Sequence, residues 1–101
     1  MPNVVEIFSY TRKDGVSEQQ LLLASDKFHS EFFAKQNGFI SWNVLKKGDV
    51  YTDIVVYETA EDLDNTLNIA QDHHATLEYN TLVDQVTTYD EMPFYTVIKS
   101  Y

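Results

Sequence analysis

The chain has 101 residues, no cysteine, and a formal net charge of −9 from 16 acidic and 7 basic residues. This length fits a single domain, residues 1–101, and the lack of cysteine excludes disulfides, thiolate metal sites and thiol nucleophiles. The acidity disfavours nucleic acid and anionic membranes as partners. Because no apolar run approaches ~18 residues and no secretory leader is recognisable, we expect a soluble cytoplasmic protein.

The first predicted strand covers residues 3–10. Its apolar residues fall on both faces, and only Glu6 and Ser9 interrupt them. A strand that is apolar on both faces is usually covered on both sides. We therefore expect this strand in the interior of a sheet.

A helix is predicted over residues 17–36. Ser17 and Gln20 have the spacing of a capping box, in which the two residues satisfy each other's backbone amides. Gly38 offers a left-handed stop, after which Phe39 could fold back on the end of the helix. The apolar face is wider than the ~100° stripe of an ordinary surface helix. We expect the helix to pack on a sheet and on a further element.

Residues 39–59 predict a β-hairpin. Two runs of strand-forming residues are separated by the turn Lys46-Lys47-Gly48-Asp49, where Gly48 can take a positive φ. The second run is rich in Val, Ile, Thr and Tyr, which fit a pleated surface.

A second helix is predicted after the hairpin. Thr59 and Asp62 repeat the capping signature, and apolar residues then recur at helical spacing as far as His74 and beyond. The pattern leaves two alternatives open: one continuous helix, or a helix that breaks near residues 72–73 and resumes through Tyr79 to Val83.

The chain is again strand-like from about Thr87, and the residue types over 94–98 alternate as expected for a strand. Pro93 lacks an amide hydrogen, which places it at the start of a strand, at a bulge or on an edge. The predicted order is therefore β-α-β-β-α-β, a ferredoxin-like α+β domain with a four-stranded antiparallel sheet and both helices on one face. The other face would be largely apolar, and we expect it to be covered in a homodimer.

This layout resembles the dimeric α/β-barrel superfamily, and within it the antibiotic-biosynthesis-monooxygenase-like proteins. The resemblance rests on the order of elements, the helix that ends in Gly38-Phe39, the hairpin, and the segment 55–59 that runs into Ala60-Glu61-Asp62-Leu63. It implies that two sheets close face to face into a barrel. It also implies a small apolar, aromatic or polyketide-like ligand between sheet and helices, with cofactor-independent monooxygenation, or an isomerase or cyclase reaction, as the chemistry.

The haem-degrading branch of that superfamily is not matched. It would imply an asparagine within the first strand and a tryptophan in the second helix. Here Asn3 lies at the strand's edge and Trp42 falls on a strand. We therefore predict neither haem nor another cofactor.

Histidines are the first candidates for proton transfer. His74 shares a stripe with apolar helix residues, so we expect it to face the sheet as a general base at the rim of a cleft. The alternative is a buried histidine satisfied by a neighbouring carbonyl. His29 could meet His74 across this layer. His73 should be solvated, and since adjacent helix positions diverge by ~100°, the pair predicts no metal site.

Glu6 and Asp53 are the second candidates for catalysis. They lie inside strands that should be neighbours, and burial together would raise the pKa of one carboxyl as acid–base work requires. The alternative is an ion pair with Lys46, Lys47 or Arg12, or exposure at an end of the barrel.

Aromatic and polar side chains are the candidates for substrate binding. They are Phe28, Phe32, Trp42, Asn43, Tyr51 and Tyr57. Such aromatics also build cores and interfaces, so a non-catalytic ligand-binding or structural dimer module remains an alternative. A minor alternative follows from Pro2, because the opening resembles tautomerases that use a proline exposed after removal of the initiator methionine.

Overall fold

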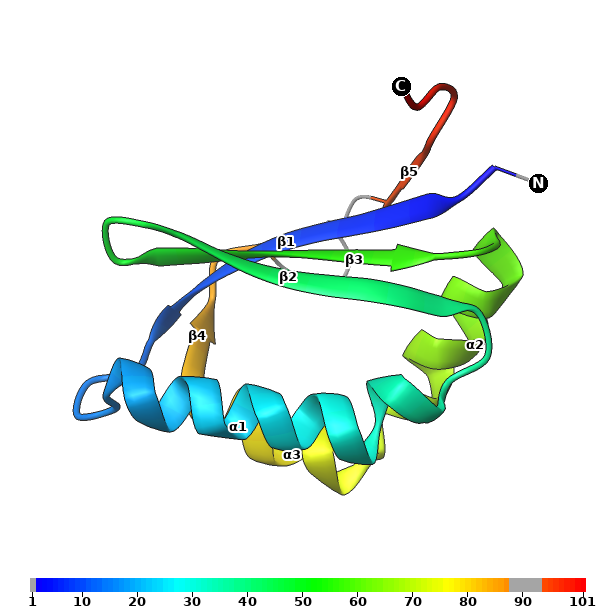
Figure 1. The fold of residues 1–101 in the computed structure, drawn as a ribbon. Helices are drawn as coiled ribbons and strands as arrows, with labels where there is room; N and C mark the ends of the chain where they lie inside the picture. The colour runs from blue at the N-terminus through cyan, green and yellow to red at the C-terminus, as the bar shows by residue number, and fades with distance from the viewer. Residues whose placement is uncertain (1, 88–93) are drawn as a thin grey trace.

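The computed structural model describes residues 2–87 and 94–101. The elements in chain order are β1 (Val4–Arg12), α1 (Glu18–Glu31), the 3-10 helix η1 (Phe33–Lys35), β2 (Phe39–Lys47), β3 (Val50–Tyr57), α2 (Ala60–Ala70), α3 (His74–Asn80), β4 (Val83–Gln85) and β5 (Phe94–Thr96). The helices lie on one side of a single antiparallel sheet (Figure 1). The predicted ferredoxin-like α+β fold is confirmed.

The sheet has the strand order β2-β3-β1-β4, and β5 also pairs with β1. β4 lies along Tyr10–Arg12 and β5 along Val4–Glu6, so two short strands occupy the place of the predicted fourth strand. We expected Val83 to end a helix, and this was wrong. Its segment pairs instead with the end of β1, whose backbone groups would otherwise lack partners. Part of the last predicted strand, with Pro93, lies outside the described residues.

The helix starts follow the predicted caps. The Ser17 hydroxyl accepts from the Gln20 amide at 3.1 Å, and the Gln20 side chain accepts from the Ser17 amide at 2.8 Å. Thr59 caps α2 in the same way, through the Asp62 amide at 3.1 Å. No helix within residues 2–87 and 94–101 has the length and apolarity needed to cross a membrane.

The helix ends are less regular than predicted. α1 stops at Glu31, not near residue 36, and the chain tightens into η1. This change lets the adjacent rings of Phe32 and Phe33 both be buried, and the Phe33 ring packs on Phe39 with 5.6 Å between centroids. Of the two alternatives for the second helix, the broken one is correct. α2 ends at Ala70, and His73 caps a separate α3.

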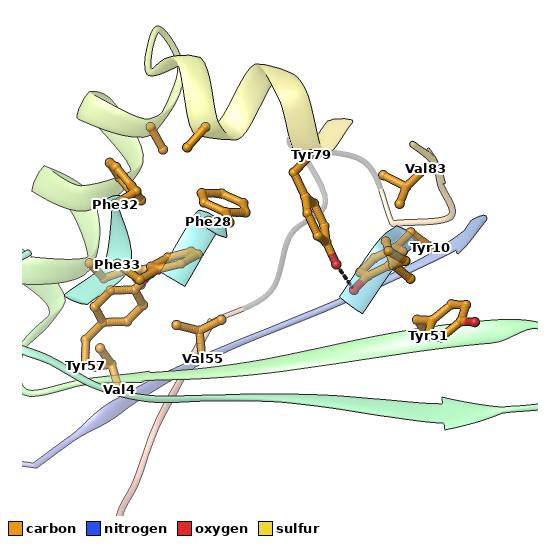
Figure 2. Packing of buried hydrophobic residues seen from close by; sticks show 14 residues of the cluster. Val4, Tyr10, Phe28, Phe32, Phe33, Tyr51, Val55, Tyr57, Tyr79 and Val83 are labelled. Carbon is orange, nitrogen blue, oxygen red and sulfur yellow. Dashed lines mark hydrogen bonds between the residues drawn. The ribbon is translucent and has the colours of Figure 1, made fainter. Parts of the chain in front are cut away.

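The core lies between the sheet and the helices (Figure 2). Its largest fully buried side chains are those of Tyr10, Leu21, Phe32, Tyr51, Val55, Tyr57 and Leu63. Alternate residues of the strands point the other way, where Figure 1 shows no helix. There Val5 faces Val56 and Ile7 faces Ile54, all four half-buried. We call these four residues the open-face cluster.

Candidate functional site

A cavity of about 40 Å³ lies between the sheet and the helices. Its walls combine aromatic rings, among them Phe28 and Trp42, with the side chains of Glu6 and Asp53. Because a buried water needs at least about 10–15 Å³, this volume corresponds to about three water molecules. It is far below the roughly 300 Å³ of a typical pocket for a drug-sized ligand.

Strands β1 and β3 bring the two acids together. Glu6 is paired with Val55 and Phe8 with Asp53, so the two carboxyl-bearing residues are diagonal neighbours. Strand parity puts both on the face that meets the helices. Glu6 is 3% exposed and Asp53 1% exposed. Of the two alternatives for these carboxylates, burial together is the one that the structure shows.

Two tyrosine hydroxyls extend from Asp53 to the helix layer. The Tyr10 hydroxyl donates to Asp53 Oδ1 at 2.8 Å, and it lies 2.6 Å from the Tyr79 hydroxyl. Figure 2 shows Tyr79 reaching from α3 toward Tyr10 on β1. A tyrosine hydroxyl has one hydrogen, and that of Tyr10 is committed to Asp53, so Tyr79 donates to Tyr10. The hydrogen-bond chain therefore runs in one direction, from Tyr79 through Tyr10 to Asp53.

Several polar atoms at the cavity have no hydrogen-bond partner among the described residues. They include Glu6 Oε2, Asp53 Oδ2 and Trp42 Nε1. The Trp42 N–H is near enough to Asp53 to lower its pKa, although its geometry falls short of a hydrogen bond. Leaving a buried polar group unpaired costs about 1–3 kcal/mol, and folded proteins contain few such groups. Unpaired polar atoms at the wall of a cavity are candidates for contact with a ligand.

Burial dominates the electrostatics of the site. It raises the pKa of Glu6 to about 7, and the nearby charge of Asp53 adds to this shift. Burial also raises the pKa of Asp53 to about 7, against the lowering effect of Tyr10 and Trp42. Both carboxyl groups therefore titrate near neutral pH. Burial raises the pKa of each of the two tyrosines as well, which keeps their hydroxyls protonated.

His74 does not face the sheet, so that prediction was wrong. Its side chain is 63% exposed, and its Nε2 lies 3.7 Å from Glu31 Oε1 on the surface. The break before α3 changes the helical phase, which takes His74 off the apolar stripe of α2. His29 is also exposed, with its ring against Phe39 at 5.7 Å. Neither histidine lines the cavity.

His73 is half-buried, not solvated as expected. Its Nδ1 accepts from the Ala75 amide at 3.1 Å, and its ring lies 4.9 Å from that of Phe32. Because it caps α3, its ring stacks on that of His74 at 4.5 Å and does not diverge from it. Among the described residues no cluster of three or more metal-binding side chains occurs.

Some of the aromatic candidates line the cavity, and the others lie elsewhere in the core. Phe28, Trp42 and Tyr57 line the cavity. Phe32 is fully buried but belongs to the surrounding core. Tyr51 stacks on the Tyr10 ring at 5.8 Å, and its hydroxyl donates to Glu18 at the surface. Three of these five side chains are thus placed to touch a ligand in the cavity.

Two other candidates lie away from the cavity. Asn43 is exposed and paired with Ile54 on the uncovered side of the sheet. It follows Trp42 directly, and successive strand residues point to opposite faces, so only one of them can meet the cavity. Pro2 is exposed and does not contribute to the cavity wall.

Tyr10 and Tyr79 were not among the residues predicted for the site. Their hydroxyls form the only hydrogen-bond chain that reaches a cavity acid in the described residues. The alternation of strand residues could have indicated Tyr10, because it is four residues after Glu6 and therefore points to the same face of the sheet. The position of Tyr79 depends on the start of α3, which the pattern left open.

Comparison with solved structures identifies proteins of the same fold. A point variant of SnoaB, a cofactor-independent oxygenase from Streptomyces nogalater, matches at 18% identity with a TM-score of 0.72, over 99% of this chain and 97% of that chain. Two further matches are provisionally assigned as antibiotic biosynthesis monooxygenases. The one from Chloroflexus aurantiacus is 13% identical with a TM-score of 0.67, over 98% of this chain and 96% of that chain. The one from Bordetella bronchiseptica is 16% identical with a TM-score of 0.66, over the full length of both.

No protein-family model matches the sequence, and no curated protein sequence matches it either. The resemblance to the antibiotic-biosynthesis-monooxygenase-like group is confirmed at the level of the fold. At these identities the likeness extends to the fold alone, since one scaffold supports unrelated reactions.

Proposed function

We propose that this protein is an enzyme of the antibiotic-biosynthesis-monooxygenase-like type that acts on a small aromatic or polyketide-like substrate. One observation carries the proposal: two buried carboxyl groups, Glu6 and Asp53, titrate near pH 7 inside a cavity with aromatic walls. A general base works best when its pKa lies close to the working pH. A strongly raised carboxyl pKa in a cavity is typical of such sites.

The reaction begins with proton transfer from the substrate. An ionised carboxylate of the pair accepts a proton from an acidic C–H or O–H group, and the substrate becomes an enolate or phenolate. Trp42 Nε1, a donor without a partner among the described residues, is placed to hydrogen-bond an oxygen on which that negative charge develops. In this reading the acids of the sheet take the role that the sequence assigned to His74 and His29.

Oxygenation follows from the electron richness of the anion. An enolate can transfer an electron to dioxygen, and recombination of the substrate radical with superoxide forms a carbon–oxygen bond as a peroxide. Protonation of the peroxide and loss of water break the O–O bond, so one oxygen atom stays in the product as a carbonyl and the other leaves as water, with dioxygen as the oxidant and no redox group on the protein. The apolar walls favour this step, because exclusion of water strengthens electrostatic interactions and limits premature reprotonation. The similarity to a cofactor-independent oxygenase supports this choice of chemistry.

The small cavity means that the substrate must open the site. α2 contributes Thr66 and Leu67 to its wall and α3 contributes Tyr79. The two helices are separate bodies joined at residues 71–73. We propose that they move away from the sheet when the substrate binds. The same small volume favours a second candidate function, a ligand-binding or structural dimer module without chemistry.

We also propose that the active form is a homodimer joined through the open-face cluster. In one chain these side chains lie on a sheet face that Figure 1 shows without a covering helix. Contiguous apolar surface on a sheet is normally covered by a partner. A two-fold axis would let the same face cover itself in a second copy.

Oxygen uptake with two probe substrates tests the enzymatic proposal. Anthrone and naphthohydroquinone are aromatic compounds whose anions react with dioxygen. We expect uptake above the uncatalysed rate, and a loss of about 100-fold or more in Asp53→Asn, the usual contribution of an acid–base group. His74→Ala, which changes a surface histidine, should leave the rate unchanged.

A thermal-shift screen with the same compounds separates the candidates. A ligand at 100 times its dissociation constant adds about 2.7 kcal/mol to the free energy of unfolding. Stabilisation without oxygen uptake favours the binding module. If the aromatic probes produce neither stabilisation nor oxygen uptake, that result contradicts a small-molecule function and favours the structural dimer.

A further inference from the structure

We propose that the hydroxyl chain Tyr79–Tyr10 selects which of the two buried acids is charged, so that Asp53 holds the negative charge and Glu6 holds the proton. The two tyrosines are thereby positioning residues for the acid pair. The distribution of charge is a property of the folded chain itself. Only its use in turnover rests on the proposed function.

The first support is the asymmetry of hydrogen bonding. Asp53 Oδ1 accepts from Tyr10 at 2.8 Å, and Tyr10 in turn accepts from Tyr79 at 2.6 Å. Hydrogen bonds to a carboxylate favour its charged form, and a donor that itself accepts a bond becomes a better donor. Glu6 Oε2 and Asp53 Oδ2 are both buried without a partner, but of the two acids only Asp53 accepts a hydrogen bond from a tyrosine hydroxyl among the described residues. The two acids are similarly buried, but hydrogen bonding thus favours the charged form of Asp53 over that of Glu6.

The second support is the rigidity of the chain. The Tyr10 ring stacks on Tyr51 at 5.8 Å and meets Tyr79 edge-on at 5.9 Å between centroids. Tyr10 is fully buried and Tyr79 is 3% exposed. Packed rings on β1 and α3 therefore hold the hydroxyls in place. Figure 2 shows the two hydroxyls pointing at each other across the layer between helix and sheet.

The third support is the lack of a competing cation. The titratable groups on the described cavity wall are Glu6, Asp53, Tyr10, Tyr57 and Tyr79, and no lysine, arginine or histidine is among them. These groups come from β1, β3 and α3, while α1 and α2 present uncharged side chains to the cavity. A second negative charge beside Asp53 would have no nearby cation to offset it. One proton is therefore retained by the pair near neutral pH, and it remains on Glu6.

This division of charge gives the two acids different tasks if the proposed enzymatic function holds. Asp53 lines the cavity, its Oδ2 has no hydrogen-bond partner among the described residues, and it would take the substrate proton. Glu6, which is protonated, would donate a hydrogen bond or a proton to an oxygen of the product. Proton balance over the cycle is kept, since the proton taken up by Asp53 equals the one that Glu6 releases.

Carbon-13 NMR titration of the side-chain carboxyl carbons tests the proposal without any substrate. In the unaltered protein we expect Asp53 to ionise at lower pH than Glu6. Tyr10→Phe should raise the apparent pKa of Asp53 by about one to two units, the size expected for a lost hydrogen bond to a charged group, and so reverse the order. Tyr79→Phe should shift it in the same direction by less, because only the outer bond of the chain is lost.

Tyr51→Phe is the matched control. It keeps the ring that stacks on Tyr10 and removes only a hydroxyl bonded to Glu18 at the surface, so both carboxyl titrations should be unchanged. In Asp53→Asn the apparent pKa of Glu6 should fall, because a neighbouring negative charge is gone. The variant spectra must retain the dispersion of the folded protein.

Two results would overturn the proposal. One is that Glu6 ionises at lower pH than Asp53 in the unaltered chain, and the other is that Tyr10→Phe leaves the apparent pKa of Asp53 unchanged. If Tyr10→Phe does not fold, Tyr79→Phe decides, and an unchanged Asp53 titration there rejects the selecting chain. Failure of the oxygen-uptake assay leaves these titrations interpretable. The two proposals can thus fail separately.

Discussion

At the scale of single residues, the unusual feature is a pair of carboxyl groups inside an aromatic core. Glu6 and Asp53 are almost completely buried, and no basic side chain lines the described cavity beside them. A buried carboxylate without a cation is costly, and the usual response is a raised pKa. The raised pKa links the stability of the fold to pH.

The direction of that link follows from proton counts. In the unfolded chain both groups have ordinary pKa values, near 4, whereas in the folded protein each is raised to about 7. Between these values the folded state binds more protons than the unfolded state. The stabilisation is therefore fully present below about pH 4 and is lost as the pH rises through 7.

We predict that the free energy of unfolding falls between pH 4 and 7.5. A shift of this size in one group corresponds to roughly 3 kcal/mol, and the two coupled groups contribute less than twice that. Urea titrations at several pH values measure the slope. Glu6→Gln keeps the shape and removes one titrating group, so its profile should be flatter. Equal slopes in both proteins would contradict a raised pKa for Glu6.

The sequence placed the two acids on neighbouring strands, but it did not decide whether they are buried. Glu6 and Asp53 lie inside well-defined strands, yet the first strand is apolar on both faces, so alternation alone does not say which face meets the helices. His74 was assigned by helical phase across a boundary that local pattern could not settle, and a break at residues 71–73 turned it outward. Helical phase predicts which face a residue occupies only within one continuous helix.

At the scale of elements, the passage from η1 to β2 depends on Gly38. This residue has φ +78°, and its carbonyl accepts from the Glu58 amide at 2.8 Å. A Cβ on Gly38 would overlap the side chain of Asp62, which Thr59 holds at the start of α2. The same glycine thus serves a left-handed turn and a close contact between two elements.

We predict that Gly38→Ala destabilises the protein more than Gly48→Ala does. Both positions have positive φ, which costs an alanine about 1–2 kcal/mol, but a Cβ on Gly48 meets open space. Gly38→Ala adds an overlap that should cost a further 1–3 kcal/mol or so. Thermal and urea unfolding of the two variants gives the comparison. Equal losses in the free energy of unfolding of the two variants would show that the Asp62 side chain moves away from the added Cβ without destabilising the protein.

Local chemistry predicted where elements begin, but tertiary contacts decided where they end. The caps at Ser17 and Thr59 and the turn at Gly48 are each read from a few adjacent residues, and each was confirmed. The end of α1 depends on burying Phe32 beside Phe33, and the three-residue strand β4 forms only because β1 offers an edge. Such short elements have no period long enough to be detected.

At the scale of the whole molecule, two properties oppose each other. The open-face cluster favours association, while two copies that each carry −9 repel one another. Salt screens that repulsion, with a Debye length of about 10 Å at 0.1 M. Self-association through this face should therefore strengthen as ionic strength rises, the opposite of an interface held by ion pairs.

We predict that the protein is a dimer of twice 11.7 kDa and that Ile54→Lys converts it to a monomer. Ile54 belongs to the open-face cluster, opposite Ile7, and a buried lysine there would lack a partner across the interface. Leu23→Lys, at a 61% exposed position of α1, adds the same charge elsewhere and should remain dimeric. Light scattering at micromolar concentration measures both masses. A monomer for the unaltered chain, or a dimer for Ile54→Lys, would mean that this face is not the interface, and the barrel that the family resemblance implies would then not form through it.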